Sequence, residues 1–249
     1  MNKTALFGFG MACVWMTGAA GADDKTGPAS WSYDGKTAPA HWAELDRANR
    51  ACAGKEQSPI NIEESVAGKA ALAALDFQYE AGDADMHNNG YTVQVAIARG
   101  SELKVGAEHA ELVEFHFHTP AEETINGVAY PLVAHLMHKH ADGKLYGVAV
   151  LYKQGLPNLA LAPLFTSLPE TGKRVLPGFN PAALLPDNHA YFKYTGSIST
   201  PPCTDGVRWH VLKQPVEISK NQIAAFHRLY KMNARPTQAL NGRVVESSK

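Results

Sequence analysis

A short alternating stretch near the middle of the chain constrains the fold more than any other feature. Residues 112–120 read Leu-Val-Glu-Phe-His-Phe-His-Thr-Pro, a period of two that predicts a half-buried strand. Residues two apart in a strand project from the same face. The apolar face would carry Val113, Phe115 and Phe117, and the polar face Glu114, His116 and His118. Two adjacent imidazoles preceded by an acid suit a metal site, although a polar face that merely carries two histidines is the alternative.

A second strand-like run offers the third protein ligand that a catalytic zinc needs beside its open water position. This run is Tyr130–His140, and it contains His135. Residues 119–129 form a hairpin-length connection, so the two strands are expected to pair and to bring His135 beside the two earlier histidines. His138 falls on the opposite face of the run and His140 lies at its end, so we expect neither to bind the metal.

The first residues of the chain indicate export. Met1–Lys3 is a short basic start, Ala5–Met16 is apolar, and Ala20–Ala22 is an Ala-x-Ala site, the three parts of a secretory signal peptide. We therefore predict a signal peptide over residues 1–22 and a mature periplasmic or secreted domain over residues 23–249, with no membrane attachment after cleavage. A lipoprotein acylated at Cys13 is the alternative.

Composition excludes several other partners. The 249 residues carry a formal net charge of −1, with no block of like charge that would favour nucleic acid or a membrane surface. Two cysteines, Cys52 and Cys203, remain after signal removal, and in an exported chain they most simply make one disulfide. A disulfide that closes such a long loop stabilises the folded state by roughly 4–5 kcal/mol on the chain-entropy model. Two free thiols are the alternative.

The rest of the chain predicts one mainly β domain with few helices. No internal repeat or domain-breaking linker is present. Residues 57–62 lead into a short strand, and further strands are expected over residues 91–98 and 143–152. Helices are expected over residues 67–75, 158–168 and 219–233. Ser219 and Gln222 form a capping-box pair at the start of the last helix. Residues 194–202, Tyr-Thr-Gly-Ser-Ile-Ser-Thr-Pro-Pro, form a stiff loop of hydroxyl residues that ends at Cys203.

Assembled in order, these segments resemble the α-class carbonic anhydrases, especially the secreted bacterial ones. The resemblance covers a core of about residues 31–241. It rests on Trp31-Ser-Tyr33, Gln57-Ser-Pro-Ile-Asn-Ile62, Asn88-Asn-Gly90, Phe115-His-Phe-His118, Ala134-His-Leu136, Gly196-Ser197 with Thr200-Pro-Pro-Cys203, and Asn233 with Arg235-Pro236. It implies a twisted, mostly antiparallel sheet with short peripheral helices, one Zn2+ on the three histidines, supporting roles for Tyr33 and Asn233, and the Cys52–Cys203 disulfide.

The activity that the resemblance implies is reversible hydration of CO2 to bicarbonate and a proton. In carbonic anhydrases, zinc lowers the pKa of its bound water from about 15.7 to about 7, so zinc hydroxide attacks CO2 at neutral pH. The matching hydroxyl residue is Ser199, which would pass its hydrogen bond to Glu122, and Thr200 would help position bicarbonate. The family usually has Thr where Ser199 stands. Because serine keeps the oxygen but lacks the methyl group, we expect retained activity with looser orientation.

Two departures from the family pattern concern the surroundings of the metal. Where the family places a glutamate behind the third histidine, this chain has Val133, and where it commonly has a glutamine behind the first, this chain has Glu114. His135 would then bond backbone, another side chain or water, which predicts weaker zinc retention. Tyr91 stands at the shuttle-histidine position and, with a pKa of about 10, is a poor proton relay. His87 is a possible substitute, so turnover is predicted to be limited by proton transfer.

The resemblance also gives positions for the wall of the cleft, which are Gln94, Met137, Gly147, Ile198 and Trp209. Gly147 stands where the family usually has a valine, which predicts a roomier CO2 pocket.

Two alternatives to this function remain open. One is a cupin-type metalloenzyme, since His116-x-His118-x3-Glu122 also fits the opening of that motif. The other is a catalytically weak, carbonic-anhydrase-like binding module. The expected partner is the small-molecule substrate, and the chain is expected to be a monomer or a homodimer.

Overall fold

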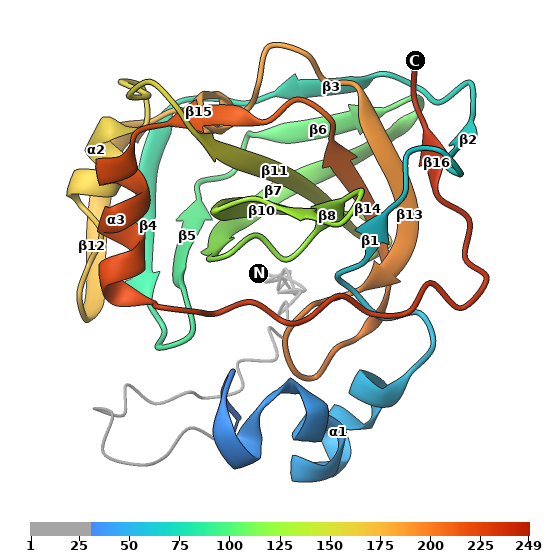
Figure 1. Ribbon diagram of the computed structural model, residues 1–249. Helices are drawn as coiled ribbons and strands as arrows, with labels where there is room; N and C mark the ends of the chain where they lie inside the picture. The colour runs from blue at the N-terminus through green and yellow to red at the C-terminus, as the bar shows by residue number, and fades with distance from the viewer. Residues whose placement is uncertain (1–30) are drawn as a thin grey trace, which may run out of the picture. The chain divides into compact units, whose positions relative to one another are not determined.

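The computed structural model describes residues 31–249 (Figure 1). The predicted signal peptide and its cleavage site lie outside the described residues. Within residues 31–249, no helix is both long enough and apolar enough to cross a membrane.

The described chain is dominated by strands. They are β1 (Asn61–Ile62), β2 (Gly68–Lys69), β3 (Leu75–Gln78), β4 (Gly82–Asn88), β5 (Val93–Ile97), β6 (Glu102–Val105), β7 (Glu108–His118), β8 (Thr124–Ile125), β9 (Val128–Ala129), β10 (Leu132–His140), β11 (Leu145–Gln154), β12 (Gly172–Phe179), β13 (Tyr191–Ser197), β14 (Asp205–Leu212), β15 (Val216–Ile218) and β16 (Glu246–Ser247). The α-helices are α1 (Trp42–Leu45), α2 (Ala162–Thr166) and α3 (Lys220–Leu229). The 3-10 helices are η1 (Gly35–Thr37), η2 (Pro39–His41), η3 (Arg47–Ala53) and η4 (Pro181–Leu184).

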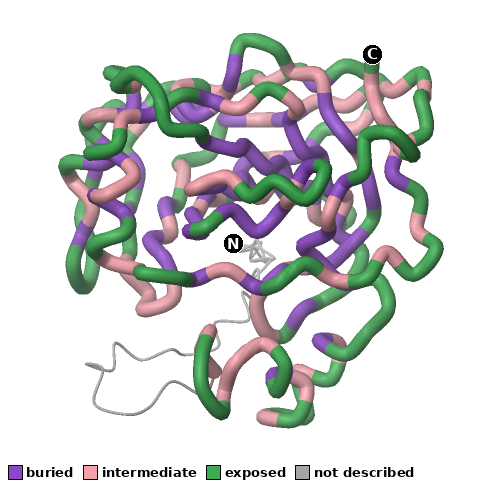
Figure 2. The backbone as a smooth tube through the Cα atoms, in the orientation of Figure 1, coloured by how far each residue is buried: buried purple, intermediate pink, exposed green. Residues whose placement is uncertain are grey.

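One large sheet organises the domain, as the predicted fold class requires. Its main path runs β12-β4-β5-β7-β10-β11-β14-β13-β16-β2, with β3, β6 and β15 attached at its sides. Most neighbours are antiparallel, and the parallel exceptions in this sheet are β11 with β14, β11 with β15, and β16 with β2. A small second sheet, β1-β8-β9, stands beside the central strands. In Figure 2 the central strands are mostly buried and the connecting loops mostly exposed.

The alternating residues of β10 separate two hydrophobic clusters on opposite faces of the sheet. Leu132, Ala134 and Leu136 belong to the larger cluster, which also holds Phe115 and Phe117 of β7. Val133 belongs to the smaller cluster, with Leu151, Trp209 and the residues of β1 and β8. Since His135 follows Val133 by two residues, it projects on the side of the smaller cluster. The predicted division of these strands into an apolar and a polar face is therefore largely confirmed.

A β-bulge in β7 corrects one part of that prediction. Glu114 pairs with Met137 of β10, but Leu112 pairs with the very next residue, His138, so Val113 is the extra residue. Leu112 is thereby turned into the larger cluster, while Val113 is 40% exposed. His138, the partner of Leu112, follows Leu136 by two residues and so lies on the core face, as predicted, where it is fully buried.

The local predictions vary in outcome. Residues 67–75 contain the short strand β2 and the start of β3 rather than a helix, because the sheet edge pairs this segment with β16 and β6. The strand predicted at residues 143–152 is β11, which is buried along most of its length. The last helix, α3, begins at the predicted capping box of Ser219 and Gln222 but ends at Leu229. In the predicted 158–168 helix only Ala162–Thr166 is α-helical.

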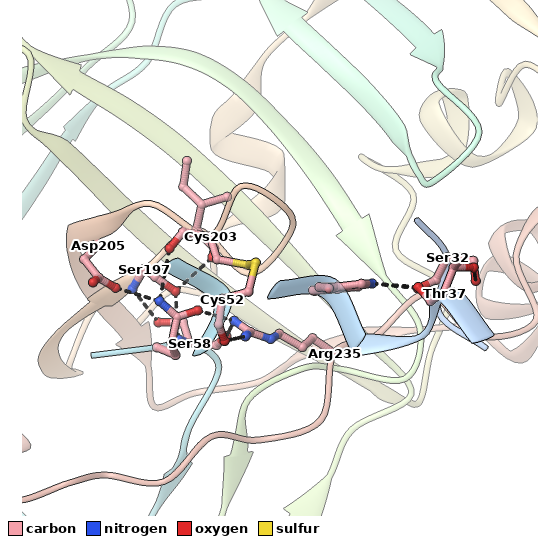
Figure 3. Close-up of a disulfide and its surroundings, with 11 residues drawn as sticks. Ser32, Thr37, Cys52, Ser58, Ser197, Cys203, Asp205 and Arg235 are labelled. Atoms are coloured by element: carbon pink, nitrogen blue, oxygen red, sulfur yellow. Dashed lines mark hydrogen bonds between the residues drawn. A yellow bond between two sulfur atoms is a disulfide. The ribbon is translucent and has the colours of Figure 1, made fainter. Parts of the chain in front are cut away.

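The predicted disulfide joins the segment before β1 to the loop after β13. Cys52 and Cys203 are bonded across 151 residues of chain (Figure 3). The buried Arg235 guanidinium supports this junction, because it donates to the Cys52 carbonyl at 2.9 Å and to the Ser58 carbonyl at 2.8 Å. Its guanidinium also lies 5.4 Å from the centre of the Trp42 ring. Two distant segments are thus held against each other by covalent, polar and aromatic contacts.

Candidate metal centre and active site

Pairing of β7 with β10 brings the three predicted metal ligands together. His135 lies directly opposite His116 in the antiparallel register, and His118 follows two residues later on the same face. Their potential ligand atoms all lie within 4.8 Å of one another. His118 and His135 are fully buried, and the His116 side chain is 18% exposed. His138 and His140 stand outside this group, as predicted.

Each imidazole of this group is held from behind by a hydrogen bond on one nitrogen. Nδ1 of His116 lies 3.0 and 3.1 Å from the two oxygens of Glu114, and Nδ1 of His118 lies 2.7 Å from the Asn233 carbonyl. Nε2 of His135 lies 3.0 Å from both oxygens of Glu123. Since carboxylates and carbonyls only accept, the ring nitrogens donate in each pair.

The nitrogens left over face one another. Nε2 of His118 and Nδ1 of His135 are buried and have no hydrogen-bond partner among the described residues. Leaving such a group buried and unpaired costs roughly 1–3 kcal/mol, which a bound cation would offset. Three imidazoles gathered in this way fit a zinc ion, which prefers nitrogen ligands and leaves one coordination position open in catalytic sites.

Burial and neighbouring charges shift the pKa values of two of these histidines in opposite directions. Burial, reinforced by the two neighbouring imidazoles, lowers the pKa of His118 well below its usual value. Burial also acts to lower the pKa of His135, but Glu123, with Glu122 and Glu114, outweighs it and raises that pKa. The acids around His135 therefore favour its protonated form, and equally favour a bound cation.

A cavity of about 330 Å3 opens above the three histidines. Four of the five predicted cleft-wall residues line it, namely Gln94, Met137, Ile198 and Trp209. Its lining also includes residues predicted for other roles, namely Tyr33, Tyr91, Glu114, Ser199 and Thr200. Val113, Trp31 and Leu145 also line it and were not predicted there. The cavity therefore brings apolar side chains together with the three histidines and the hydroxyl residues Ser199 and Thr200.

Gly147 does not line this cavity. A Cβ atom at this position would lie only 2.5 Å from Cε3 of Trp209, because the indole packs directly against the glycine backbone. The indole is also held by a 2.9 Å hydrogen bond from its Nε1 to the Ser197 carbonyl. The space expected from the missing side chain at position 147 is therefore filled by Trp209 rather than added to the pocket.

Glu122 lies behind the ligands, buried with its neighbour Glu123. Its Oε1 accepts a 2.7 Å hydrogen bond from the Arg235 backbone N–H, whereas its Oε2 has no partner of good geometry among the described residues. Burial raises the pKa of Glu122 to about 7, against the lowering effects of His135, of that N–H and of the Ser199 hydroxyl. Ser199 is therefore close enough to Glu122 to lower the pKa of its carboxyl group, while the predicted hydrogen bond between the two stays a prediction.

The two candidates for proton relay are placed differently. Tyr91 lines the cavity and stacks on Trp31, with ring centroids 3.8 Å apart and an interplanar angle of 10°. His87 is an exposed residue of β4, and it pairs with Gln94 of β5, which in turn pairs with His116 of β7. Directly paired residues share a face, so His87 stands on the metal side of the sheet, two strands from the site.

Asn233 and Tyr33, which the sequence predicted to support the site, have different surroundings. The Asn233 side chain accepts from the Thr119 backbone N–H at 2.7 Å and donates to the Tyr91 and Phe117 carbonyls, which fixes the strand end that carries His118. The Tyr33 hydroxyl is buried without a hydrogen-bond partner among the described residues, and burial together with Glu122 raises its pKa well above the usual value.

Comparison with known proteins agrees with this geometry. The family model described as eukaryotic-type carbonic anhydrase matches residues 37–249. The chain belongs to the carbonic anhydrase family. It is accordingly an enzyme of that family, as the sequence predicted, and the cupin-type alternative is wrong. A carbonic anhydrase from Klebsiella pneumoniae is 39% identical over 222 residues, which cover 86% of this chain and 89% of that protein.

Solved structures extend the likeness to the fold. The α-carbonic anhydrase of Thermovibrio ammonificans, in complex with the inhibitor sulfanilamide, superposes with a TM-score of 0.85 at 39% identity and covers 90% of this chain and 100% of that one. Dioscorin complexed with ascorbate superposes with a TM-score of 0.83 at 29% identity, covering 87% of this chain and 97% of dioscorin. The same fold is thus also found in dioscorin, whose solved complex contains ascorbate.

One functional contact escaped the sequence analysis. Glu123 follows the predicted Glu122, but nothing in the local pattern shows that two successive acids are both buried and address the same imidazole. The available signal was indirect: Val133 cannot accept a hydrogen bond, so a buried His135 needed an acceptor from elsewhere in the chain.

Proposed function

We propose that this enzyme catalyses the reversible hydration of CO2 to bicarbonate and a proton at a zinc ion held by His116, His118 and His135. The observation that carries the proposal is the convergence of three imidazoles that each offer one ring nitrogen, all of them within 4.8 Å of one another. Zinc in such a site supplies the nucleophile by lowering the pKa of the water it holds to about 7, the value known for carbonic anhydrases.

Residues on one side of the cavity orient the nucleophile. Glu122 Oε1 is occupied by the Arg235 N–H and its Oε2 has no hydrogen-bond partner among the described residues, so the Ser199 hydroxyl would donate to Oε2 and its lone pairs would accept a hydrogen bond from the attacking oxygen. Thr200, next in the chain and also at the cavity surface, is positioned to bond an oxygen of bicarbonate. Positioning of this kind lowers the barrier by fixing the reacting atoms before the reaction.

The apolar side of the cavity receives CO2. Met137, Ile198 and Trp209 line it close to the histidines, and none of them offers a strong hydrogen bond to the substrate. Carbon dioxide is linear and uncharged, so an apolar wall can hold it weakly, whereas the charged bicarbonate product is disfavoured against that wall because burying a charge is costly. Replacing Ser199 by threonine tests the orientation argument, because our proposal expects turnover at least equal to wild type; lower turnover contradicts it.

We further propose that His87, rather than Tyr91, transfers protons between the site and solvent. A tyrosine hydroxyl with an ordinary pKa of about 10 does not collect protons at neutral pH, whereas an exposed imidazole does. Pairing through Gln94 places the His87 Cα about 10 Å from that of His116, given strand-pair spacings of 4.5–5.5 Å, so a short chain of waters would be needed.

This relay has a direct test. His87→Ala should lower the turnover of CO2 hydration in weakly buffered solution, and added imidazole buffer should restore it. His189→Ala is the matched control, since His189 packs against Phe77 away from the cavity lining. Equal turnover of His87→Ala and wild type in weak buffer contradicts the relay.

Stopped-flow CO2 hydration with zinc analysis of the purified protein tests the main proposal. We expect one zinc per chain and hydration that disappears in His135→Ala. The likeness to dioscorin, whose solved complex contains ascorbate, favours a second candidate, a binding module without rapid catalysis. Zinc-loaded protein without hydration activity would support that candidate and refute ours.

We propose that the enzyme is exported, as its first 22 residues predict. The buried Cys52–Cys203 disulfide supports this, because such bonds persist mainly in oxidising compartments. Mass analysis of protein recovered outside the cytoplasm should find a chain that begins at Asp23. A chain that retains residues 1–22 there contradicts the proposed cleavage. The mature enzyme is predicted to be a monomer or a homodimer, and sedimentation analysis would distinguish the two.

A further inference from the structure

His135 is oriented differently from the other two metal-site histidines. His116 and His118 have Nδ1 bonded from behind and turn Nε2 toward the centre, whereas His135 has Nε2 bonded and turns Nδ1 toward the centre. A ring nitrogen that binds a cation must carry no proton, so the proton of neutral His135 has to reside on Nε2. That proton needs an acceptor, because the ring is completely buried.

Glu123 provides this acceptor. Both of its oxygens lie 3.0 Å from Nε2 of His135, and the residue is fully buried. Among residues 31–249, no lysine or arginine forms an ion pair with Glu123, so its only ion-pair partner is the imidazole. A buried carboxylate that has one partner is strongly tied to it, since an unpaired buried charge is costly.

The strand that carries His135 cannot supply the same contact. Val133, two residues earlier on the same face, is buried in the apolar cluster of Leu151 and Trp209. The acceptor comes instead from the loop after β7. Adjacent Thr124 fixes that loop, because it pairs with Asn61 of β1 and its hydroxyl donates to the Asn61 side chain at 2.7 Å.

Building on the proposed zinc-dependent function, we propose that Glu123 is the positioning residue for His135 and sets how tightly the site retains zinc. Its carboxylate holds the proton on Nε2 and the ring plane in place, so Nδ1 stays free and aimed at the metal. The weak zinc retention expected from the apolar Val133 is then avoided, since the missing acid has been supplied from another part of the chain.

Two variants separate orientation from charge. Glu123→Leu removes the acceptor, and Glu123→Gln keeps an acceptor oxygen without the charge. We measure the rate at which zinc passes to excess chelator at constant pH. Groups that support metal ligands typically affect metal affinity or activity 10–100-fold, so Glu123→Leu should release zinc about 10–100 times faster than wild type. Glu123→Gln should release zinc at a rate between those of wild type and Glu123→Leu.

Controls distinguish this role from a structural one. Glu170→Leu, an exposed glutamate away from the site, should release zinc at the wild-type rate. Melting curves with and without zinc should show that Glu123→Leu mainly reduces the zinc-dependent rise in melting temperature; a purely structural residue would lower both melting temperatures equally and leave that rise unchanged. Wild type without stoichiometric zinc refutes the proposed function itself. Wild type with one zinc, but with equal release from Glu123→Leu, refutes only the role of Glu123.

Discussion

Removal of the Cys52–Cys203 disulfide should cost this enzyme much stability without changing its metal site. The bond closes 151 residues of chain. For a closure of that length, the chain-entropy model gives a loss of about 5 kcal/mol in the free energy of unfolding at 25 °C. In a domain of this size, such a loss lowers the melting temperature by about 10–20 °C.

The folded state explains why the effect should act mainly through the unfolded chain. The contacts beside the bond use backbone oxygens rather than sulfur. Arg235 donates to the Cys52 carbonyl at 2.9 Å (Figure 3). Gln57 donates to the Cys203 carbonyl at 3.0 Å. The Cys203 N–H also donates to the Thr200 carbonyl at 2.8 Å, which keeps the Ser199 loop closed. These bonds survive the loss of the two sulfur atoms.

The assay is urea unfolding of wild type and of the Cys52→Ala/Cys203→Ala double variant, with zinc content measured on each. We expect an unfolding free energy lower by about 3–5 kcal/mol, since native strain and residual unfolded structure often reduce the effect. Zinc content should stay at one per chain. Reductant should destabilise wild type and leave the variant unchanged. A loss under about 1 kcal/mol, or loss of zinc from the folded variant, refutes the reasoning.

Two further predictions concern packing and pH. Gly147→Val should displace Trp209, because a Cβ atom there would lie 2.5 Å from the indole, and should cost about 1–3 kcal/mol in urea unfolding; unchanged stability contradicts this packing. Burial lowers the pKa of His138 to about 3 and that of His210 to about 4, so the unfolded chain binds these protons first. Each of these two rings therefore contributes stability that is complete above about pH 6.5 and that falls toward pH 4 by about 1.4 kcal/mol per pH unit. His138→Gln should make the rise of the unfolding free energy with pH, measured by urea unfolding between pH 5 and 6, less steep by about 1.4 kcal/mol per pH unit. An unchanged slope would contradict the buried, neutral state of His138.

Local sequence pattern was sufficient for the elements that carry the metal ligands. A period of two over residues 112–120 and a second strand-like run containing His135 predict two neighbouring strands, because strand geometry alone decides which side chains share a face. The capping box before α3 was equally readable, since Ser219 and Gln222 interact within one turn. Where the tertiary context overrode local preference, as at residues 67–75, the prediction of a helix was wrong.

The sequence by itself determined the chemistry available to this enzyme: three histidines at strand spacing, a hydroxyl loop tethered by a cysteine, and an apolar residue where an acid was expected. Only the tertiary structure decided how those groups meet. The bulge at Val113, the burial of Gly147 beneath Trp209 and the contact of Glu123 with His135 depend on register and packing between distant segments. Such contacts have no periodic signature, because the partners are chosen by three-dimensional proximity and by the need to satisfy buried polar groups.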